Sequence, residues 1–77
     1  MKEFLEKLVR YLVEKPDKVE VSEVDGEGVI ILKLKVDKED IGIVIGKRGR
    51  TADSLRTILN AVGAKAGKRL VLEILES

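Results

Sequence analysis

Two stretches of alternating apolar residues, separated by Asp25-Gly26-Glu27-Gly28, constrain the fold of this chain more than any other feature. The glycines between them tolerate the positive φ angles of a tight turn between antiparallel strands. In residues 18–24, Val19 and Val21 fall on one face of a strand. Residues 29–36 divide in the same way, with Ile30, Leu32, Leu34 and Val36 on one face and Ile31, Lys33 and Lys35 on the other. We predict a β-hairpin with one buried face.

A segment with helical spacing precedes this hairpin, and another follows it. The first, in residues 2–14, has its apolar residues on one side of a helix: Phe4, Leu5, Leu8, Val9 and Leu12. Pro16 predicts the end of this helix because it biases the preceding residue away from helical angles. The second begins at Arg50 and has a similar stripe: Ala52, Leu55, Ile58, Leu59 and Val62. Either Gly63 or Gly67 is expected to end it.

Residues 69–75 alternate again, which predicts a third strand with Leu70, Leu72 and Ile74 on one face. Before the second helix, Asp37 is placed to cap a further element, with Glu39 and Asp40 in its first turn. The following run, residues 41–45, is β-branched and contains a glycine, so by propensity alone it favours a strand. The residues themselves therefore leave the conformation of this run open.

The composition describes one small domain, residues 1–77, without the usual catalytic groups. The chain is 44% hydrophobic and 38% charged, which favours a compact core over disorder. It has no cysteine and no histidine, which excludes disulfides, thiolate zinc sites, thiol catalysis and the commonest general base. The phosphate-binding pattern of P-loop nucleotide hydrolases is also missing. We expect a non-enzymatic protein that needs no metal and no cofactor.

No apolar run approaches the roughly 20 residues of a membrane span. Acidic residues interrupt the apolar positions at the N-terminus, unlike in a signal peptide. We therefore expect a cytoplasmic protein without membrane contact. Gln is absent and Asn occurs once, at Asn60, whereas Lys and Glu are abundant. This composition is typical of a thermophilic source.

Charge is unevenly distributed along the chain. Residues 1–40 carry eight Lys and Arg against eleven Asp and Glu, whereas residues 41–77 carry seven against three. Only Asp53 opposes the cations between residues 46 and 69, which are Lys47, Arg48, Arg50, Arg56, Lys65, Lys68 and Arg69. Such a concentration suits a polyanionic partner, although a solvated basic surface is an equally simple reading.

The two glycines at positions 46 and 49 enclose two cations and lead directly into the second amphipathic helix. Glycine allows the backbone to turn sharply and to approach a partner closely. The free N–H groups at the start of a helix favour an anion. Spacing alone is weak evidence, since helix-to-helix turns also use glycine. The combination with Lys47, Arg48 and Arg50 predicts a site for a phosphate backbone.

The segment Val44-Ile45-Gly46-Lys47-Arg48-Gly49-Arg50-Thr51-Ala52 resembles the core signature of the KH RNA-binding domain. The element order resembles the type II KH topology, α-β-β-α-α-β, in which residues 40–45 would be a short helix. The resemblance covers essentially the whole chain, and a chain of this size most resembles the small bacterial KhpA (YlqC) family. It implies an α+β fold with a three-stranded mixed sheet packed against helices.

The resemblance also implies a mode of binding. In KH domains the G-x-x-G loop clamps the backbone of about four nucleotides of single-stranded RNA. Bases lie on an aliphatic platform, for which Ile43, Val44, Ile45 and Leu55 are candidates, although a small core needs such residues too. The RNA-binding residues predicted in this way are Gly46, Lys47, Arg48, Gly49, Arg50, Ile43, Val44, Ile45 and Arg56.

Two residues depart from the family pattern. Ala52 stands where many KH signatures have a larger aliphatic residue, and Asp53 brings a negative charge close to the loop. Both would narrow the platform or weaken binding without abolishing phosphate contact. The chain has only two aromatic residues, Phe4 and Tyr11, both far in sequence from the loop. This excludes RNA-recognition motifs and OB folds, which stack bases on aromatic rings.

The same resemblance implies protein partners and a cellular role. Proteins of this type form homodimers or pair with a larger KhpB (Jag/EloR)-like KH protein. They act as post-transcriptional regulators or RNA chaperones connected with cell elongation, cell shape and cell-wall growth. A different class of function is an interaction module in which RNA binding is weak or carried by the partner. A piece of a longer RNA-binding protein is a further alternative, which the Met1 start disfavours.

Overall fold

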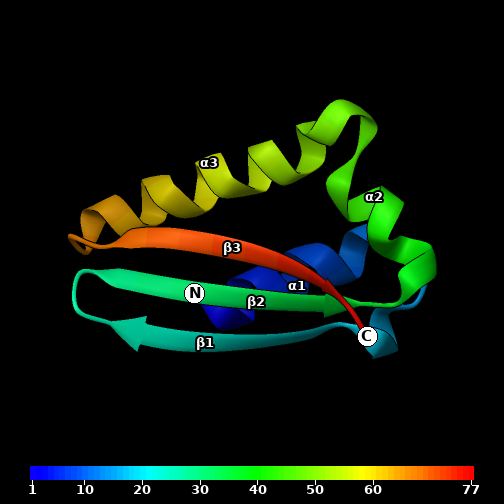
Figure 1. Ribbon diagram of the computed structural model, residues 1–77, viewed down its shortest axis with the longest axis horizontal. Helices are drawn as coiled ribbons and strands as arrows, with labels where there is room; N and C mark the ends of the chain where they lie inside the picture. The colour runs from blue at the N-terminus through cyan, green and yellow to red at the C-terminus, as the bar shows by residue number, and fades with distance from the viewer.

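The predicted β-hairpin forms, with its first strand two residues further along the chain than the predicted range 18–24 (Figure 1). The computed structural model describes residues 1–77. Strand β1 (Glu20–Gly26) pairs antiparallel with β2 (Val29–Val36), and the turn between them is two residues long. Strand β3 (Arg69–Glu76) lies parallel to β2 on its other side. The result is a mixed sheet of order β1-β2-β3, with β1 and β3 as its edges.

Two long helices cover one face of this sheet and leave the other open (Figure 1). Helix α1 (Lys2–Leu12) packs on β1, and α3 (Arg50–Lys65) packs on β3. The short helix α2 (Ile41–Ile45) lies against the N-terminal part of α3. Single 3₁₀ turns occur at Pro16–Lys18, Lys38–Asp40 and Lys47–Gly49. None of the helices unites the length and the apolar character that crossing a bilayer requires.

One hydrophobic core lies between the sheet and the helices. Its thirteen buried residues come from all three helices, all three strands and the residues that flank the 3₁₀ turn Pro16–Lys18. They are Leu5, Val9, Val13, Val19, Val21, Leu32, Leu34, Val36, Val44, Leu55, Leu59, Leu70 and Leu72. The faces predicted for the strands are therefore confirmed. Lys33 and Lys35, which alternate with the buried residues of β2, lie on the open face of the sheet.

The apolar stripes of the two long helices are wider than the surfaces that they bury. Ile58 and Val62 of α3 are each 42% exposed, and Phe4 and Leu12 of α1 are 46% and 42% exposed. Each helix meets the sheet along one line of residues, so the apolar flank beside that line stays in solvent. The sequence pattern alone did not distinguish the apolar residues that are buried from those that stay exposed.

The β-branched run at residues 41–45 is helical, as the family resemblance implies and against its propensity. Burial of Val44 against the core outweighs the local preference for a strand. Asp37 caps the preceding turn as predicted, because its Oδ1 accepts a hydrogen bond from the Glu39 N–H at 2.9 Å. Helix α3 ends at Lys65, so Gly67 rather than Gly63 marks its end.

Asp40 lies in the first turn after Asp37, as the sequence predicts. It has a further role that the sequence did not reveal, because only 1% of it is exposed. Its carboxylate accepts hydrogen bonds from the backbone N–H groups of Glu14 and Lys15, at 3.2 and 3.0 Å. These groups follow the end of α1, where the extended backbone of Val13 (φ −91°, ψ 163°) leads the chain away from the helix. Asp40 thus joins the end of α1 to the start of α2.

Candidate nucleic-acid interface

The two glycines bound a tight connection between α2 and α3, at one end of the molecule (Figure 1). We call residues 46–49 the glycine loop. The Gly46 N–H donates to the Gly42 carbonyl at 2.9 Å and closes α2. The Gly49 N–H donates to the Gly46 carbonyl at 3.1 Å and closes the loop. Both glycines have positive φ, at 77° and 75°. The loop is thus a short, internally hydrogen-bonded turn.

Position 46 requires glycine for two reasons, its backbone angles and the lack of room for a Cβ. Its angles, φ 77° and ψ 172°, lie in a region that is essentially restricted to glycine. A Cβ at this position would lie 2.2 Å from Thr51 Oγ1 and 2.8 Å from the Thr51 backbone nitrogen. The loop therefore packs directly on the first turn of α3. No other residue type fits there without moving that turn.

Arg48, at the tip of the loop, is the only residue other than glycine with a positive φ, 59°. A left-handed conformation costs on the order of 1 kcal/mol in a residue with a Cβ. Backbone strain of this kind concentrates at functional sites. The loop thus holds the Arg48 backbone in a conformation that this residue does not favour by itself, and the side chain is exposed.

The cations of the loop are exposed and unpaired. Lys47, Arg48 and Arg50 line a small hollow of about 180 Å³, and none of them forms an ion pair. By contrast, Lys68 is paired with Asp25 at 2.6 Å. No side chain caps the start of α3, and the Arg50 N–H donates to the Lys47 carbonyl. Three free cations and a helix start together favour a phosphate.

A groove of about 450 Å³ continues from the loop between α3 and the free edge of β3. We call it the loop groove. Its lining is mainly aliphatic and includes three charged residues. The lining residues are Ile45, Gly49, Ala52, Asp53, Arg56, Leu72, Glu73, Ile74 and Leu75. An apolar floor beside a cationic loop suits a base next to its phosphate.

The predicted platform residues separate into two groups. Ile45 is 38% exposed and lines the loop groove, and Ile43 is 37% exposed but does not line it. Val44 and Leu55 are buried in the core, at 0% and 3% exposure. Neither is available to a base, because α2 and α3 turn these side chains inward.

Other predicted residues do lie at the groove. Arg56 lines it, and its Nη1 lies 3.6 Å from Asp53 Oδ1. Sequence reasoning missed the contribution of β3, residues 72–75, because only the fold brings this strand beside α3. The alternation of apolar residues predicts the strand, but it does not predict that α3 lies beside it.

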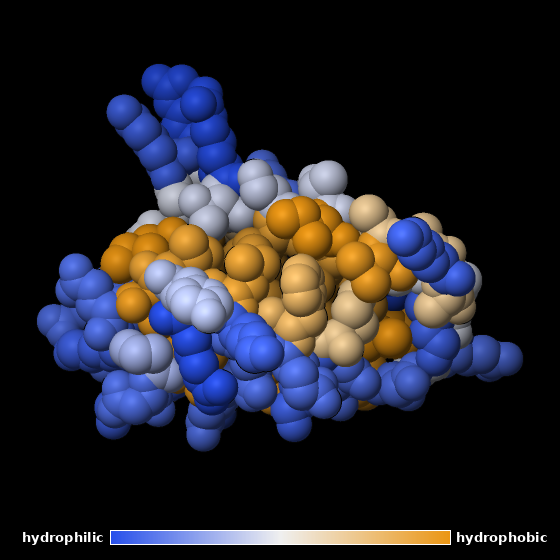
Figure 2. Space-filling model, turned by 180° about the vertical axis from the view of Figure 1, so that it is seen from behind, coloured by the Kyte–Doolittle hydropathy of each residue, from blue (hydrophilic) through white to orange (hydrophobic).

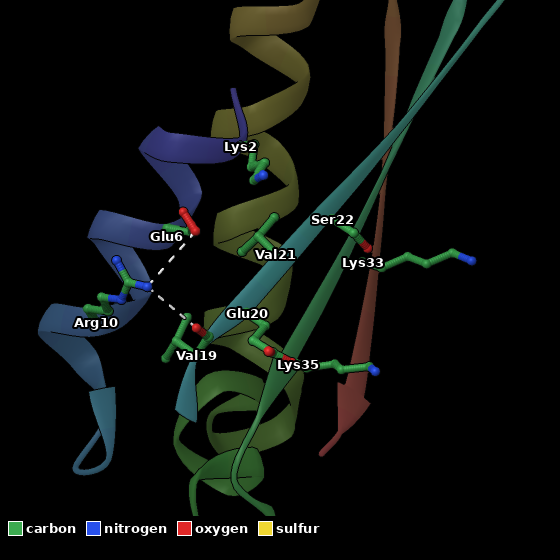
Figure 3. A pocket seen from close by; sticks show the side chains of 9 residues that line it. All are labelled: Lys2, Glu6, Arg10, Val19, Glu20, Val21, Ser22, Lys33 and Lys35. Carbon is green, nitrogen blue, oxygen red and sulfur yellow. Dashed lines mark hydrogen bonds and ion pairs between the residues drawn. The ribbon is translucent and has the colours of Figure 1, made fainter. Parts of the chain in front are cut away.

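A second hollow, of about 410 Å³, lies between α1 and the edge strand β1 (Figure 3). Carboxylates and cations are mixed in its lining. Arg10 is engaged there with Glu6, at 3.9 Å, and donates to the Val19 carbonyl at 3.5 Å. In Figure 3 the side chains of Lys33 and Lys35 point away from α1, along the other face of the sheet. This hollow therefore does not concentrate positive charge as the glycine loop does.

An α-β-β-α-α-β order with a glycine loop between two helices and a mixed three-stranded sheet is the architecture of a type II KH domain. Comparison with known proteins agrees. The family described as KhpA/KhpB, KH domain, matches residues 2–74. The chain belongs to this family, as the resemblance in its sequence predicts.

Several relatives are similar over nearly their whole length. The RNA-binding protein KhpA of Aquifex aeolicus is 51% identical over 76 residues, which cover 99% of this chain and 96% of that protein. The RNA-binding protein KhpA of Clostridium acetobutylicum is 53% identical over 75 residues, with coverage of 97% and 100%. The protein of the same name in Chlamydia trachomatis is 47% identical over 76 residues, with coverage of 99% and 97%. The family is not one of enzymes, in agreement with the expectation from composition.

Proposed function

We propose that this protein binds single-stranded RNA and that the glycine loop holds the sugar-phosphate backbone. The observation that carries the proposal is a group of three exposed, unpaired cations beside the loop groove: Lys47 and Arg48 on the glycine loop and Arg50 at the start of α3. The names of the relatives, RNA-binding protein KhpA, support the same partner. Binding requires no chemical step.

The proposed mechanism divides the nucleotide between two surfaces. A phosphate lies in the hollow at Lys47, Arg48 and Arg50, close to the first N–H groups of α3. The adjoining base lies in the loop groove, where Ile45 and Leu75 offer partly exposed aliphatic surface. Because neither Phe4 nor Tyr11 lines the groove, bases make aliphatic contacts and hydrogen bonds instead of stacking on rings.

Titration of ¹⁵N-labelled protein with a short single-stranded RNA tests this placement. The amide signals of residues 45–56 and 72–75 should shift, and those of Lys33 and Lys35 on the open sheet face should not. Shifts centred on the hollow between α1 and β1, or no shifts at all, would contradict the proposal.

A second candidate function, association with another KH protein, is favoured by a separate surface. Figure 2 shows a continuous apolar area on the side of the molecule that faces away from the viewer in Figure 1. We call the following partly exposed apolar residues of α1 and α3 the apolar face: Phe4, Leu8, Leu12, Ile58 and Val62. Exposed apolar surface of this kind is typical of a protein-binding site. We propose a second copy of this chain, or a KhpB-like protein, as its occupant.

This second function is compatible with RNA binding. At 100° per residue, Ile58 and Val62 lie on one flank of α3, and Asp53 and Arg56 lie on the opposite flank. The buried line of the helix, with Leu59 at its centre, separates the two flanks. A partner on the apolar face would therefore leave the loop groove open to RNA.

We further propose a cytoplasmic role in post-transcriptional regulation, connected with cell elongation and cell shape, as the resemblance to the KhpA family implies. Deletion of the gene should alter cell length and the abundance of transcripts that crosslink to the protein. Normal cell dimensions together with an unchanged transcriptome would contradict this role.

A further inference from the structure

Asn60 is the only residue of α3 that forms a hydrogen bond with β3. Its Oδ1 atom accepts from the backbone N–H of Leu70 at 3.1 Å. Its Nδ2 atom donates to the Arg56 carbonyl at 3.0 Å, one turn earlier in the helix. Because the amide donates at one end and accepts at the other, the second hydrogen bond fixes which end faces the strand. Asn60 therefore bridges the two elements that flank the loop groove, in one fixed orientation.

The bridge lies at the end of the loop groove that is farther from the glycine loop. The Arg69 N–H donates to the Gly28 carbonyl beside β2, at 3.0 Å. Backbone groups of successive strand residues point to opposite sides of the strand, so those of Leu70, Leu72 and Ile74 point away from β2. Leu72 and Ile74 line the loop groove, whereas Leu70 does not. The groove thus ends where the free edge of β3 is taken up by the side chain of α3.

This hydrogen bond adds a directional contact to a junction that is otherwise apolar. Helix α3 and strand β3 meet through buried leucines, which are Leu55, Leu59, Leu70 and Leu72. Apolar contact is non-directional, so it opposes separation of the two elements more than their sliding. A hydrogen bond requires a defined distance and angle. Gly63 permits the close approach that brings the short Asn60 side chain within reach, since a Cβ at position 63 would lie 2.9 Å from Leu70 Cγ.

We propose that Asn60 is a positioning residue for RNA, which fixes the register of α3 against β3 and thereby the shape of the loop groove. Asn60 does not line the groove itself, but Arg56 and Leu72, on either side of the bridge, do. This inference rests on the proposed RNA binding and adds a residue that acts on the groove from outside it. Asn60 also provides an acceptor for a buried N–H group and so contributes to stability. That contribution alone would leave the RNA affinity of the folded protein unchanged.

Two substitutions separate the two hydrogen bonds of Asn60. Asn60→Thr keeps a bond to the Arg56 carbonyl, as Thr57 has with the Asp53 carbonyl at 3.0 Å. The threonine hydroxyl ends one bond earlier than the amide and does not reach Leu70. Asn60→Asp keeps an acceptor for the Leu70 N–H and loses the donor to Arg56. Thr57→Ala is the matched control, because it removes a bond of the same spacing within α3 that does not involve β3.

The test combines amide spectra of the free proteins with RNA titrations of the folded variants, folding being checked by circular dichroism. In Asn60→Thr the signals of residues 72–75 should shift before any RNA is added. Affinity for a short single-stranded RNA should fall about fivefold, the factor that corresponds to one hydrogen bond of typical net strength. The salt dependence of binding should stay at the wild-type value, because no phosphate contact is lost. Asn60→Asp and Thr57→Ala should leave the signals of residues 72–75 close to those of wild type.

Hydrogen exchange in the wild-type protein tests the bridge without any substitution. The Leu70 amide should be protected, whereas the Leu72 amide, on the same free edge, should exchange fast. Equal exchange of these two amides, or an unchanged RNA affinity in Asn60→Thr, would overturn this inference while leaving RNA binding intact. Failure of the wild-type protein to bind any single-stranded RNA would overturn the proposed function as well.

Discussion

The carboxylate of Asp40 accepts a hydrogen bond from the backbone N–H of Lys15 at 3.0 Å, although the residues are 25 positions apart in the sequence. The same carboxylate binds the Glu14 N–H at 3.2 Å. Because α2 begins at the next residue, Ile41, this contact fixes the direction in which α2 approaches the glycine loop. A buried acid on one side of the molecule thus helps to position the loop.

Replacing this acid should destabilise the protein. Asp40→Ala leaves two partly buried N–H groups without acceptors, and we expect a loss of about 2–3 kcal/mol in the free energy of unfolding. Asp40→Asn keeps one acceptor oxygen and should lose about 1 kcal/mol. Urea denaturation measures both. Asp17→Ala, at an exposed acid, should change stability by less than about 0.5 kcal/mol. Equal stabilities for Asp40→Ala and wild type would contradict this role.

The two loop glycines should differ in their tolerance of a methyl group. Gly46→Ala combines unfavourable backbone angles with contact against Thr51, so we expect a loss of about 3 kcal/mol or more. Gly49→Ala shares the positive φ, but its Cβ meets nothing within 4 Å. We therefore expect a loss of about 1 kcal/mol there. Thermal unfolding compares the pair, and equal losses would mean that contact with Thr51 is unimportant.

Lys15 should make the stability of the protein fall as the pH rises in the alkaline range. A hydrogen bond with Glu39 and the charges of Asp37 and Glu39 raise the pKa of Lys15 above its ordinary value of 10.5. Its stabilising contribution is therefore complete below pH 10.5 and is lost as the pH rises through the folded-state pKa. Melting temperatures should fall more steeply at high pH for wild type than for Lys15→Met. Identical pH profiles would contradict this assignment.

The apolar face should mediate association of the protein with itself. Light scattering at tens of micromolar should give a mass above that of one chain. Ile58→Glu should shift the protein to a monomer, because a charge within such an interface is left unpaired. Val24→Glu, at an exposed valine of the hairpin, should not. A monomeric wild type, or equal effects of both substitutions, would contradict self-association through the apolar face.

Most of the fold was predictable because its local signals agree. The hairpin turn, the strand faces, the capping by Asp37 and the start of α3 all follow from residue type and spacing. The run at residues 41–45 did not follow, because burial of Val44 outweighs a β-branched preference. There the family resemblance, not the propensity, predicted the helix.

The site was predictable only where it is local in sequence. The glycine loop and its three cations lie within five consecutive residues, 46–50, and are found where the pattern placed them. The β3 side of the groove and the hydrogen bonds of Asp40 join residues that are 16 to 30 positions apart in the sequence. Spacing within one element carries no information about such contacts, so the sequence did not reveal them.

The double variant Lys47→Asp, Arg48→Asp tests whether the loop cations bind the RNA backbone. Both side chains are exposed, so the fold should be retained. The matched control is Lys33→Asp, Lys35→Asp, which makes the same change in charge on the open face of the sheet.

Affinity for single-stranded RNA should be measured for both variants over a range of salt concentrations. For the loop variant we expect at least about tenfold weaker binding and a salt dependence flatter by about 1.4 in log–log slope, because two phosphate contacts are lost. The control should retain a nearly wild-type slope. An unchanged affinity and slope in the loop variant, or the same losses in the control, would contradict the claim.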